Sequence, residues 1–199
     1  LETVQFSATS LIKDIDRCVT MDPKISNDLV YVVGDTGNEL GASEYYELFD
    51  QVGVNVPQVD FSKFRVVYKA VETAIDKGLL ASCHAVGRGG VGVHLGLMTI
   101  AGGLGMDIDL ALMPTRSGER LHNDTLIFSE SAGRFIVTLD PDNKSVVEKL
   151  FKGLPFACIG TVTDTHNRLK ITGAYGGLQI DLTEDALYTA FNQRFGDMI

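Results

Sequence analysis

The sequence lacks the features by which a protein binds nucleic acid or crosses a membrane. It has no run of Lys or Arg, and its 17 basic residues stand against 26 acidic ones, which gives a net charge of −9. A nucleic-acid backbone would meet repulsion, so we expect no nucleic-acid partner. No apolar run approaches the roughly 18 residues of a membrane-spanning helix, so we expect no membrane contact.

Cysteine is also scarce, with three residues, Cys18, Cys83 and Cys158, and no C-x-x-C pair. Their odd number and wide spacing argue against a disulfide framework or a zinc ribbon. The N-terminus lacks the basic and apolar segments of a secretory signal. These absences predict a cytoplasmic protein. The chain begins with Leu1 instead of Met, which we interpret as processing or as a domain taken from a longer chain.

What the sequence does have is the length and apolar content of one folded domain. It has 199 residues, of which 45% are hydrophobic. A chain of this length buries roughly 70% of the surface that its unfolded form exposes, so a substantial core is possible without disulfides. We therefore expect a single domain over residues 1–199.

Hydrophobic patterning alternates between strands and helices. Short β-branched or alternating runs predict strands at residues 28–34, 81–86, 106–112, 134–139, 156–164 and 168–174, the last two as a hairpin. Apolar residues three or four apart predict a long helix over residues 60–80, and shorter helices over 42–49, 92–103, 144–154 and 182–195. Thr183 is the expected N-cap of the last helix.

This order of elements predicts an α+β fold with α/β-like layering. One mixed sheet would be flanked by helices in three layers, because each amphipathic helix must cover an apolar sheet face. The late β-α-β-β-α order is partly ferredoxin-like.

The stretch at residues 82–96, SCHAVGRGGVGVHLG, joins a predicted strand to a predicted helix through a glycine-rich turn. The N–H groups of such a turn and of the helix N-terminus can converge on a phosphate. The stretch lacks the G-K-[ST] of a P-loop, and no acidic residue ends a second strand about 20 residues on, as the dinucleotide fingerprint requires. Spacing alone leaves two interpretations open, a phosphate site and a plain tight connection.

The same stretch contains two histidines, His84 and His94, with no carboxylate between them. His94 falls within the apolar pattern of the predicted helix. That position favours a packed or hydrogen-bonded histidine over a metal ligand, so we predict no metal site. A second polar stretch reads Ser-Glu-Ser at residues 129–131. It either forms a loop after a helix or presents two hydroxyls and a carboxylate to a ligand.

Three stretches together carry a family resemblance. They read VTMDPKISNDLVYVVGDTGNELGASEYY, SCHAVGRGGVGVHLGLMTIAGGLGMDIDL and LIFSESAGRFIVTL. In order and spacing the chain resembles the C-terminal domain of phosphoribosylformylglycinamidine synthase, in the aminoimidazole ribonucleotide synthetase-like superfamily, from about Thr20 to Gly173. The pieces LGASEYY and FSES-x-x-RF distinguish it from a sister enzyme such as aminoimidazole ribonucleotide synthetase.

The resemblance implies part of an ATP-dependent C–N ligase of de novo purine biosynthesis. The full enzyme forms an amidine from formylglycinamide ribonucleotide, with ATP, magnesium and ammonia from glutamine. Implied partners are an upstream synthetase half, a glutaminase domain or subunit, and phosphate-bearing small molecules. The fragment alone is expected to be inactive. The candidate phosphate- and ligand-binding residues are His84, Arg88, Gly89, Gly90, Ser129, Glu130 and Ser131, and no catalytic residue is assigned.

The turn departs from the family pattern. The family usually reads His-Asp-x-Ser-Asp/Glu-Gly-Gly-Leu, whereas this chain has Ala85 and Arg88 at the acidic positions and Gly87 at the serine. The exchange shifts the local charge by about +3. Arg88 is suited to bind phosphate directly, because its planar guanidinium matches phosphate oxygens. The alternative is an arginine that is solvated or paired with an acidic neighbour such as Glu130, in a non-catalytic domain of the same fold with a structural or regulatory role.

Overall fold

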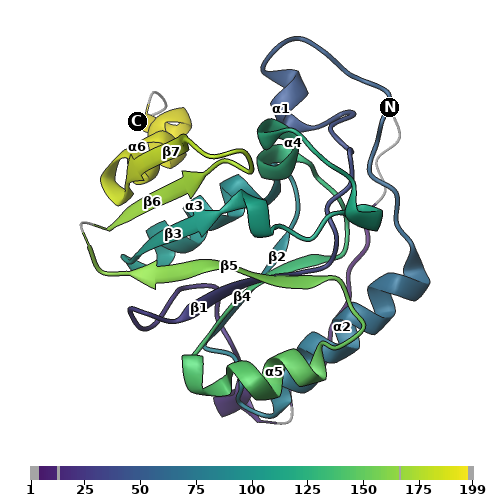
Figure 1. Cartoon of the computed structure of the whole chain (residues 1–199), viewed down its shortest axis with the longest axis vertical. Helices are drawn as coiled ribbons and strands as arrows, with labels where there is room; N and C mark the ends of the chain where they lie inside the picture. Colours follow the sequence, from purple (N-terminus) through teal and green to yellow (C-terminus); the bar gives the residue numbers. More distant parts are fainter. Residues whose placement is uncertain (1–4, 13, 166, 197–199) are drawn as a thin grey trace.

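The computed structural model describes residues 5–12, 14–165 and 167–196. Its centre is a seven-stranded mixed sheet in the order β2-β4-β1-β5-β3-β6-β7, in which only the β3–β6 pair is parallel (Figure 1). The strands are β1 (Leu29–Val33), β2 (Ser82–Val86), β3 (Gly105–Asp109), β4 (Arg134–Leu139), β5 (Phe156–Thr163), β6 (Arg168–Thr172) and β7 (Leu178–Thr183). No helix within the described ranges has the length and apolarity to cross a bilayer.

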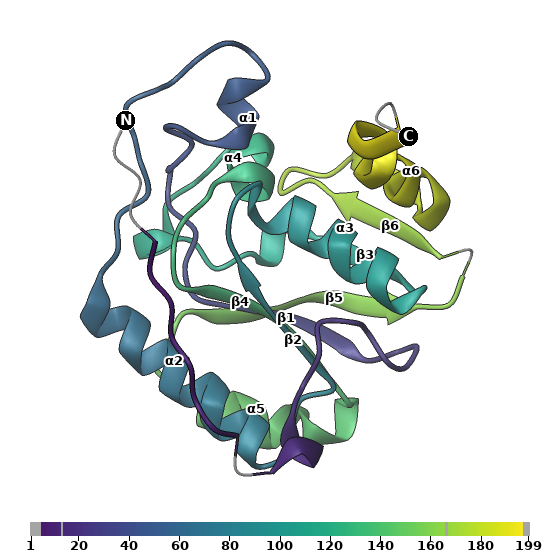
Figure 2. The ribbon, with the colours of Figure 1, turned by 180° about the vertical axis from the view of Figure 1, so that it is seen from behind.

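Helices cover both faces of the sheet, which makes three layers. Helices α2 and α5 lie below the sheet in Figure 1. Helix α3 covers the opposite face and is seen in front in Figure 2, and it contacts both α4 and α6. The α-helices are α1 (Glu44–Glu47), α2 (Phe61–Asp76), α3 (Gly90–Gly102), α4 (Asn123–Phe128), α5 (Lys144–Leu150) and α6 (Glu184–Gly196). Short 3-10 turns span Ile15–Arg17, Leu110–Leu112, Arg116–Gly118 and Pro141–Asn143. The predicted fold class is confirmed.

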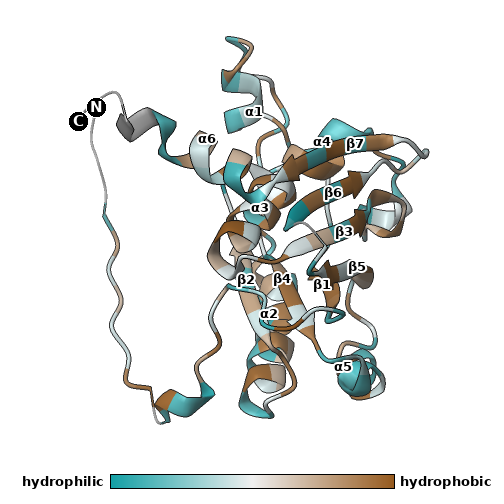
Figure 3. Ribbon diagram, turned by 90° about the vertical axis from the view of Figure 1, so that its left-hand side faces the viewer, coloured by the Kyte–Doolittle hydropathy of each residue, from teal (hydrophilic) through white to brown (hydrophobic). Residues whose placement is uncertain are grey.

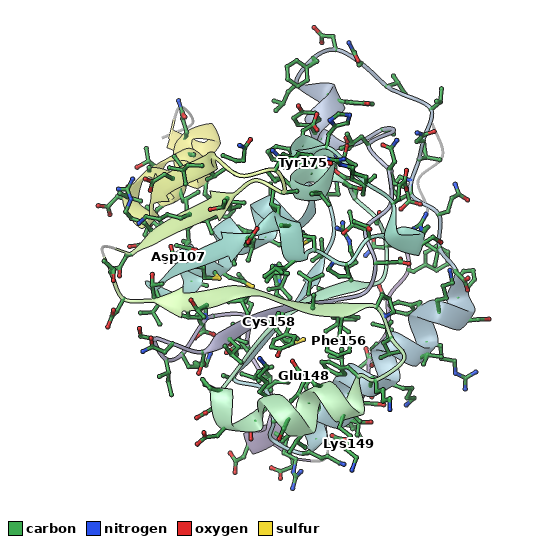
Figure 4. All side chains as sticks on the ribbon, viewed as in Figure 1. Asp107, Glu148, Lys149, Phe156, Cys158 and Tyr175 are labelled. Carbon is green, nitrogen blue, oxygen red and sulfur yellow. The ribbon has the colours of Figure 1, made fainter. Side chains whose placement is uncertain are left out.

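The core divides into two clusters because successive strand residues point to opposite faces. On β1, Val30 and Val32 belong to the cluster under α3, while Tyr31 and Val33 belong to the cluster under α2 and α5. All four side chains are fully buried. Figure 3 shows the resulting concentration of hydrophobic residues on the central strands, and Figure 4 shows Phe156 and Cys158 of β5 beside α5.

Helix α2 shows how closely the pattern predicts local structure. The Asp60 side chain accepts hydrogen bonds from the N–H groups of Ser62 and Lys63, which caps the first turn. The helix ends at Asp76, and Gly78 then takes a φ of 65°, the left-handed conformation that ends many helices. The capping role predicted for Thr183 is also confirmed, because its hydroxyl accepts from the N–H of Ala186.

The predicted hairpin of residues 156–164 with 168–174 is wrong. Strand β3 lies between β5 and β6, antiparallel to one and parallel to the other. The hairpin joins β6 to β7 instead, and β7 occupies the residues just before α6, where the pattern predicts no strand. Four of its six residues are exposed at the sheet edge and none is buried, so it lacks the alternation of a half-buried strand. The predicted strand at residues 106–112 ends at Asp109 and continues as a 3-10 turn.

Candidate functional site

Three segments that carry the family-like motifs meet at one end of the sheet. Residues 35–44 follow β1, residues 87–90 form the turn between β2 and α3, and residues 129–131 connect α4 to β4. Hydrogen bonds join the third segment to each of the other two. We call these three segments the loop cluster. Aromatic packing supports the same junction, because Tyr45 of α1 stacks on Phe128 of α4 with ring centroids 4.8 Å apart.

The two serines of the Ser-Glu-Ser loop are fully buried. The Ser129 hydroxyl donates to the carbonyl oxygen of Gly37 at 2.8 Å, and the Ser131 hydroxyl accepts from the N–H of Gly37 at 2.9 Å. The two hydroxyl oxygens lie 3.1 Å apart. Together they satisfy both backbone polar groups of Gly37, which buried backbone requires. These serines therefore hold the loop after β1 in place.

Arg134, the first residue of β4, is buried with 1% of its surface exposed. It donates to the carbonyl oxygens of Ser131 and Ser129 and to the hydroxyl of Thr36 at 2.9, 2.5 and 2.9 Å. Burial lowers the pKa of Arg134 to about 10, so the side chain remains charged at neutral pH. Its guanidinium clamps the Ser-Glu-Ser loop onto the segment after β1.

Glu130 joins all three segments of the loop cluster. One carboxylate oxygen accepts from the N–H of Gly89 at 2.8 Å and from the N–H of Glu44 at 2.9 Å. Its own N–H donates to the carbonyl oxygen of Glu39 at 3.2 Å. A carboxylate at these two N–H groups holds the position that a phosphate would take at a helix start. Gly90 is close-packed as well, since a Cβ there would lie 2.6 Å from the carbonyl oxygen of Ile127.

Glu39 and Arg116 form a second charged junction, which our sequence reasoning missed. The Arg116 guanidinium binds the two Glu39 carboxylate oxygens at 3.0 and 3.1 Å, and the N–H of Gln58 donates to the same carboxylate. Burial raises the pKa of Glu39, but the interactions with Arg116, Ser131 and Gln58 together outweigh it and leave the pKa below its ordinary value. Gly37 permits this pair, because a Cβ there would lie 2.8 Å from an Arg116 nitrogen.

Arg88 differs from the other charged groups of the loop cluster because its side chain is 80% exposed. It forms an ion pair with Glu44, whose side chain is 42% exposed. Glu130, the acidic neighbour that the sequence offered as a partner, instead binds backbone N–H groups. Exposed ion pairs are weak, at about 0–1 kcal/mol, so the guanidinium can exchange its carboxylate for another anion.

The two histidines of the turn form a hydrogen-bonded pair. His94 Nδ1 lies 2.8 Å from His84 Nε2, and the N–H of Gly87 donates to His94 Nε2 at 2.8 Å. Burial lowers the pKa of both imidazoles. Within the described residues, no group of three His, Cys, Asp or Glu side chains is arranged to hold a metal ion.

A cavity of about 720 Å³ lies at the start of α2, apart from the turn. Its lining combines apolar side chains with charged side chains of both signs. The apolar ones include Phe64, Val67 and Leu154, and the charged ones are Lys63, Arg116, Asp35 and Asp60. None of the seven candidate residues lines it. Arg116 lines this cavity and also binds Glu39 of the loop cluster, so it connects the two sites.

The fold and the loop cluster together define a synthetase-like α+β domain, in which a glycine-rich strand-to-helix turn meets a Ser-Glu-Ser loop. The chain belongs to the family described as AIR synthase related protein, C-terminal domain, whose model matches residues 26–171. The family that its three motifs predicted is confirmed.

The curated relatives are longer proteins. The chain is 34% identical over 153 residues to the phosphoribosylformylglycinamidine synthase subunit PurL of Thermococcus sibiricus, a match that covers 75% of this chain and 20% of that protein. It is 33% identical over 180 residues to the subunit of the same name from Synechocystis sp., covering 88% of this chain and 23% of the relative. The chain thus spans about a fifth to a quarter of the relatives' length.

Solved structures agree with the fold. PurL of T. maritima complexed with FGAR superposes with a TM-score of 0.74 at 18% identity, covering 87% of this chain and 30% of that one. The hydrogenase maturation protein HypE superposes with a TM-score of 0.61 at 16% identity, covering 85% and 56%. At these identities the likeness shows the shared fold.

Proposed function

We propose that the chain is the C-terminal synthetase-like domain of a phosphoribosylformylglycinamidine synthase. In that enzyme the γ-phosphoryl group of ATP passes to the amide oxygen of formylglycinamide ribonucleotide and ADP leaves. Ammonia from glutamine then adds to the activated carbon, the C–O bond breaks, and phosphate departs to give the amidine. The PurL relatives and the structure of T. maritima PurL complexed with FGAR support this assignment.

The turn between β2 and α3 does not fit a magnesium site. Magnesium prefers carboxylate oxygens and water in octahedral geometry, and Ala85 and Arg88 stand where the family has acidic residues. No step assigned to this chain therefore passes through magnesium.

The groups that react with ATP would belong to the upstream synthetase half, and ammonia would come from a glutaminase domain or subunit. The structure of PurLQS from Thermotoga maritima supports a multi-subunit assembly of that kind. The free cysteines of the chain are consistent with a cytoplasmic enzyme.

Within the enzyme, we infer that the turn recognises a phosphate-bearing ligand through Arg88. The observation that carries this inference is the contrast in exposure: Arg88 projects from the loop cluster, whereas Ser129 and Ser131 are buried. The role we assign to the other candidates, His84, Gly89, Gly90 and Glu130, is to shape the turn that presents Arg88. A ligand phosphate would displace the Glu44 carboxylate and accept two parallel hydrogen bonds from the guanidinium.

Calorimetric titration of the complete enzyme tests this role. Arg88→Ala should weaken binding of ATP or of formylglycinamide ribonucleotide by about 1.5–3 kcal/mol, the range for a hydrogen bond to a charged group. Arg88→Lys keeps the charge without the planar fork and should weaken binding less. Unchanged affinity of Arg88→Ala for both ligands would reject the proposed contact.

The non-catalytic alternative also has a specific observation in its favour. Glu130 already occupies the N–H of Gly89, and the start of α3 packs against the end of α4 at Gly90. A domain whose turn is filled in this way could serve only to support its neighbours. Under that alternative Arg88→Ala leaves ligand affinity unchanged, whereas disrupting the loop cluster still lowers the stability of the complete enzyme.

A further inference from the structure

The histidine pair bears directly on the shape of the turn. His84 lies on β2, before the turn, and His94 lies on α3, after it. The N–H of Gly87, at the beginning of the turn, donates to His94 Nε2, and the opposite nitrogen of the same ring contacts His84. The ring of His94 therefore links the backbone of the turn to the strand that precedes it.

The donors and acceptors of this chain determine the proton positions. A nitrogen that accepts from an N–H must carry a lone pair, so His94 Nε2 is unprotonated. The proton of a neutral His94 is then on Nδ1 and is donated to His84 Nε2. His84 Nε2 is therefore also an acceptor, and the His84 proton lies on Nδ1. The three groups form one directed chain, from Gly87 through His94 and from His94 to His84.

One added proton is incompatible with this series of hydrogen bonds from Gly87 through His94 to His84. A proton on His94 Nε2 faces the N–H of Gly87, so two donors oppose each other. A proton on His84 Nε2 faces the Nδ1–H of His94, with the same result. Reversing the His94–His84 bond would require the His94 proton on Nε2, which again opposes Gly87. The complete set of hydrogen bonds exists only when both rings are neutral.

We propose that His94, oriented by His84, is a positioning residue that holds residues 87–90 in the closed turn only while both imidazoles are neutral. The inference rests on the proposed function for its consequence, since the turn presents Arg88 to a phosphate-bearing ligand. Acidification then releases the N–H of Gly87, loosens the turn and weakens ligand binding without altering the ligand contact itself.

The surroundings favour the neutral pair. Burial is the main cause that lowers the pKa of each ring. The charge of a protonated His84 lowers the pKa of His94 further, and the positive charge of Arg134, from the neighbouring strand β4, adds a smaller effect in the same direction. On the turn, the carboxylate of Glu130 binds Gly89, and Arg88 faces Glu44. The closed turn is thus the state expected at neutral pH, and the open turn the state expected in mild acid.

Nitrogen-15 NMR of the imidazole rings tests the proton positions in this chain without any ligand. We expect both histidines as Nδ1–H tautomers at pH 8, although the Nε2–H form is usual for a free imidazole. Relative to other amides, which corrects for the pH dependence of exchange itself, we expect the Gly87 amide to exchange with solvent about two- to tenfold faster below the histidine titration than above it, the factor that one neutral hydrogen bond provides. A His94 Nε2–H tautomer at pH 8, or a Gly87 amide whose exchange rate relative to other amides ignores the titration, would overturn the proposal.

Two substitutions separate positioning from packing. His94→Gln keeps a side-chain acceptor that does not titrate, so the Gly87 amide should remain protected and its pH dependence should disappear. His94→Phe keeps a ring without an acceptor. The Gly87 amide of this variant should therefore exchange at every pH as fast, relative to other amides, as it does in the natural chain in acid. Equal protection in both variants would contradict the proposal. If His94→Phe fails to fold, the tautomer measurement on the unaltered chain still decides the question.

Ligand titration of the complete enzyme distinguishes this proposal from the proposed function. If both hold, affinity falls between pH 8 and pH 5.5 more steeply in the natural enzyme than in His94→Gln. If Arg88 does not bind the ligand, affinity is insensitive to Arg88→Ala while the tautomers and the Gly87 exchange stand as predicted. Tautomers that differ from the prediction, with affinity still dependent on Arg88, would reject the histidine mechanism alone.

Discussion

Arg134 and Arg88 lie in opposite environments of one loop cluster. Arg134 is buried and donates to three oxygens of the protein, whereas Arg88 is mostly exposed and has one exposed carboxylate as its partner. Burying a cation is costly unless hydrogen bonds compensate it, so the three hydrogen bonds of Arg134 give it a structural role. Arg88 contributes little to stability and is available to a ligand. A family-specific motif can therefore contain residues that hold the loop cluster together, which we call the frame, as well as residues that contact a ligand.

The largest expected effect comes from removing the buried arginine. Arg134→Met leaves Ser129, Ser131 and Thr36 without their donor, and each buried unsatisfied group costs about 1–3 kcal/mol. We expect the free energy of unfolding of this chain to fall by about 3–5 kcal/mol in urea denaturation. Arg65→Met, an exposed position on α2, should change it by less than about 0.5 kcal/mol and is the matched control. If Arg134→Met lowers the free energy of unfolding by less than about 1 kcal/mol, Arg134 does not have a stronger structural role than Arg88.

The next effect concerns the Glu39–Arg116 pair and depends on pH. Glu39→Gln should cost about 1.5–3 kcal/mol at pH 7, because it breaks charge-assisted hydrogen bonds in a buried position. The pKa of Glu39 is lowered in the folded protein, so the unfolded chain binds more protons as the pH falls. The stabilisation is present above the unfolded carboxyl pKa of about 4.3 and is lost as the pH falls through the folded value.

Urea midpoints at pH 7 and at pH 4 or below would measure this difference. The natural chain should lose stability toward acid, and Glu39→Gln should lose less, so that the gap between the two narrows. A gap that widens in acid would mean that the carboxyl pKa is raised instead.

Glu130 should have an intermediate effect because it joins the frame to the turn. Glu130→Gln keeps the shape and a neutral acceptor but weakens two charge-assisted hydrogen bonds, so we expect a loss of about 1–2 kcal/mol in the free energy of unfolding. Glu72→Gln on α2 breaks an exposed pair with Lys69 and should cost no more than about 0.5 kcal/mol. Equal losses of unfolding free energy in Glu130→Gln and Glu72→Gln would show that Glu130 does not help to hold the loop cluster together.

The smallest effect is expected at the exposed arginine. Arg88→Ala should change the stability of this chain by no more than about 0.5 kcal/mol, as for other surface positions. Thermal or urea unfolding would measure it. A loss comparable to that of Arg134→Met would show that Arg88 is part of the frame and would weaken its assignment to a ligand.

Sequence patterns predicted six of the seven strands, β1 to β6, and the long helix, because these elements carry strong local periodicity. They failed at β7 and at the pairing of β5 with β3, since the order of strands in a sheet depends on contacts distant in sequence. The same limit applies to the site. The motifs located the turn and the Ser-Glu-Ser loop, but nothing local indicated that Glu130 binds Gly89 or that Arg116 reaches Glu39. The only signal for these contacts was that acidic and basic residues, such as Glu39 and Arg116, both occur in the predicted loops.

Amide hydrogen exchange at Gly89 and Glu44 tests most directly whether the Ser-Glu-Ser loop frames the turn. Both N–H groups bind the Glu130 carboxylate, so both should be protected in the natural chain. In Glu130→Gln we expect exchange at these two amides to quicken about tenfold, the factor that corresponds to roughly 1.4 kcal/mol, while amides in the centre of β1 change far less. Unchanged exchange at Gly89 and Glu44 in Glu130→Gln would contradict the account.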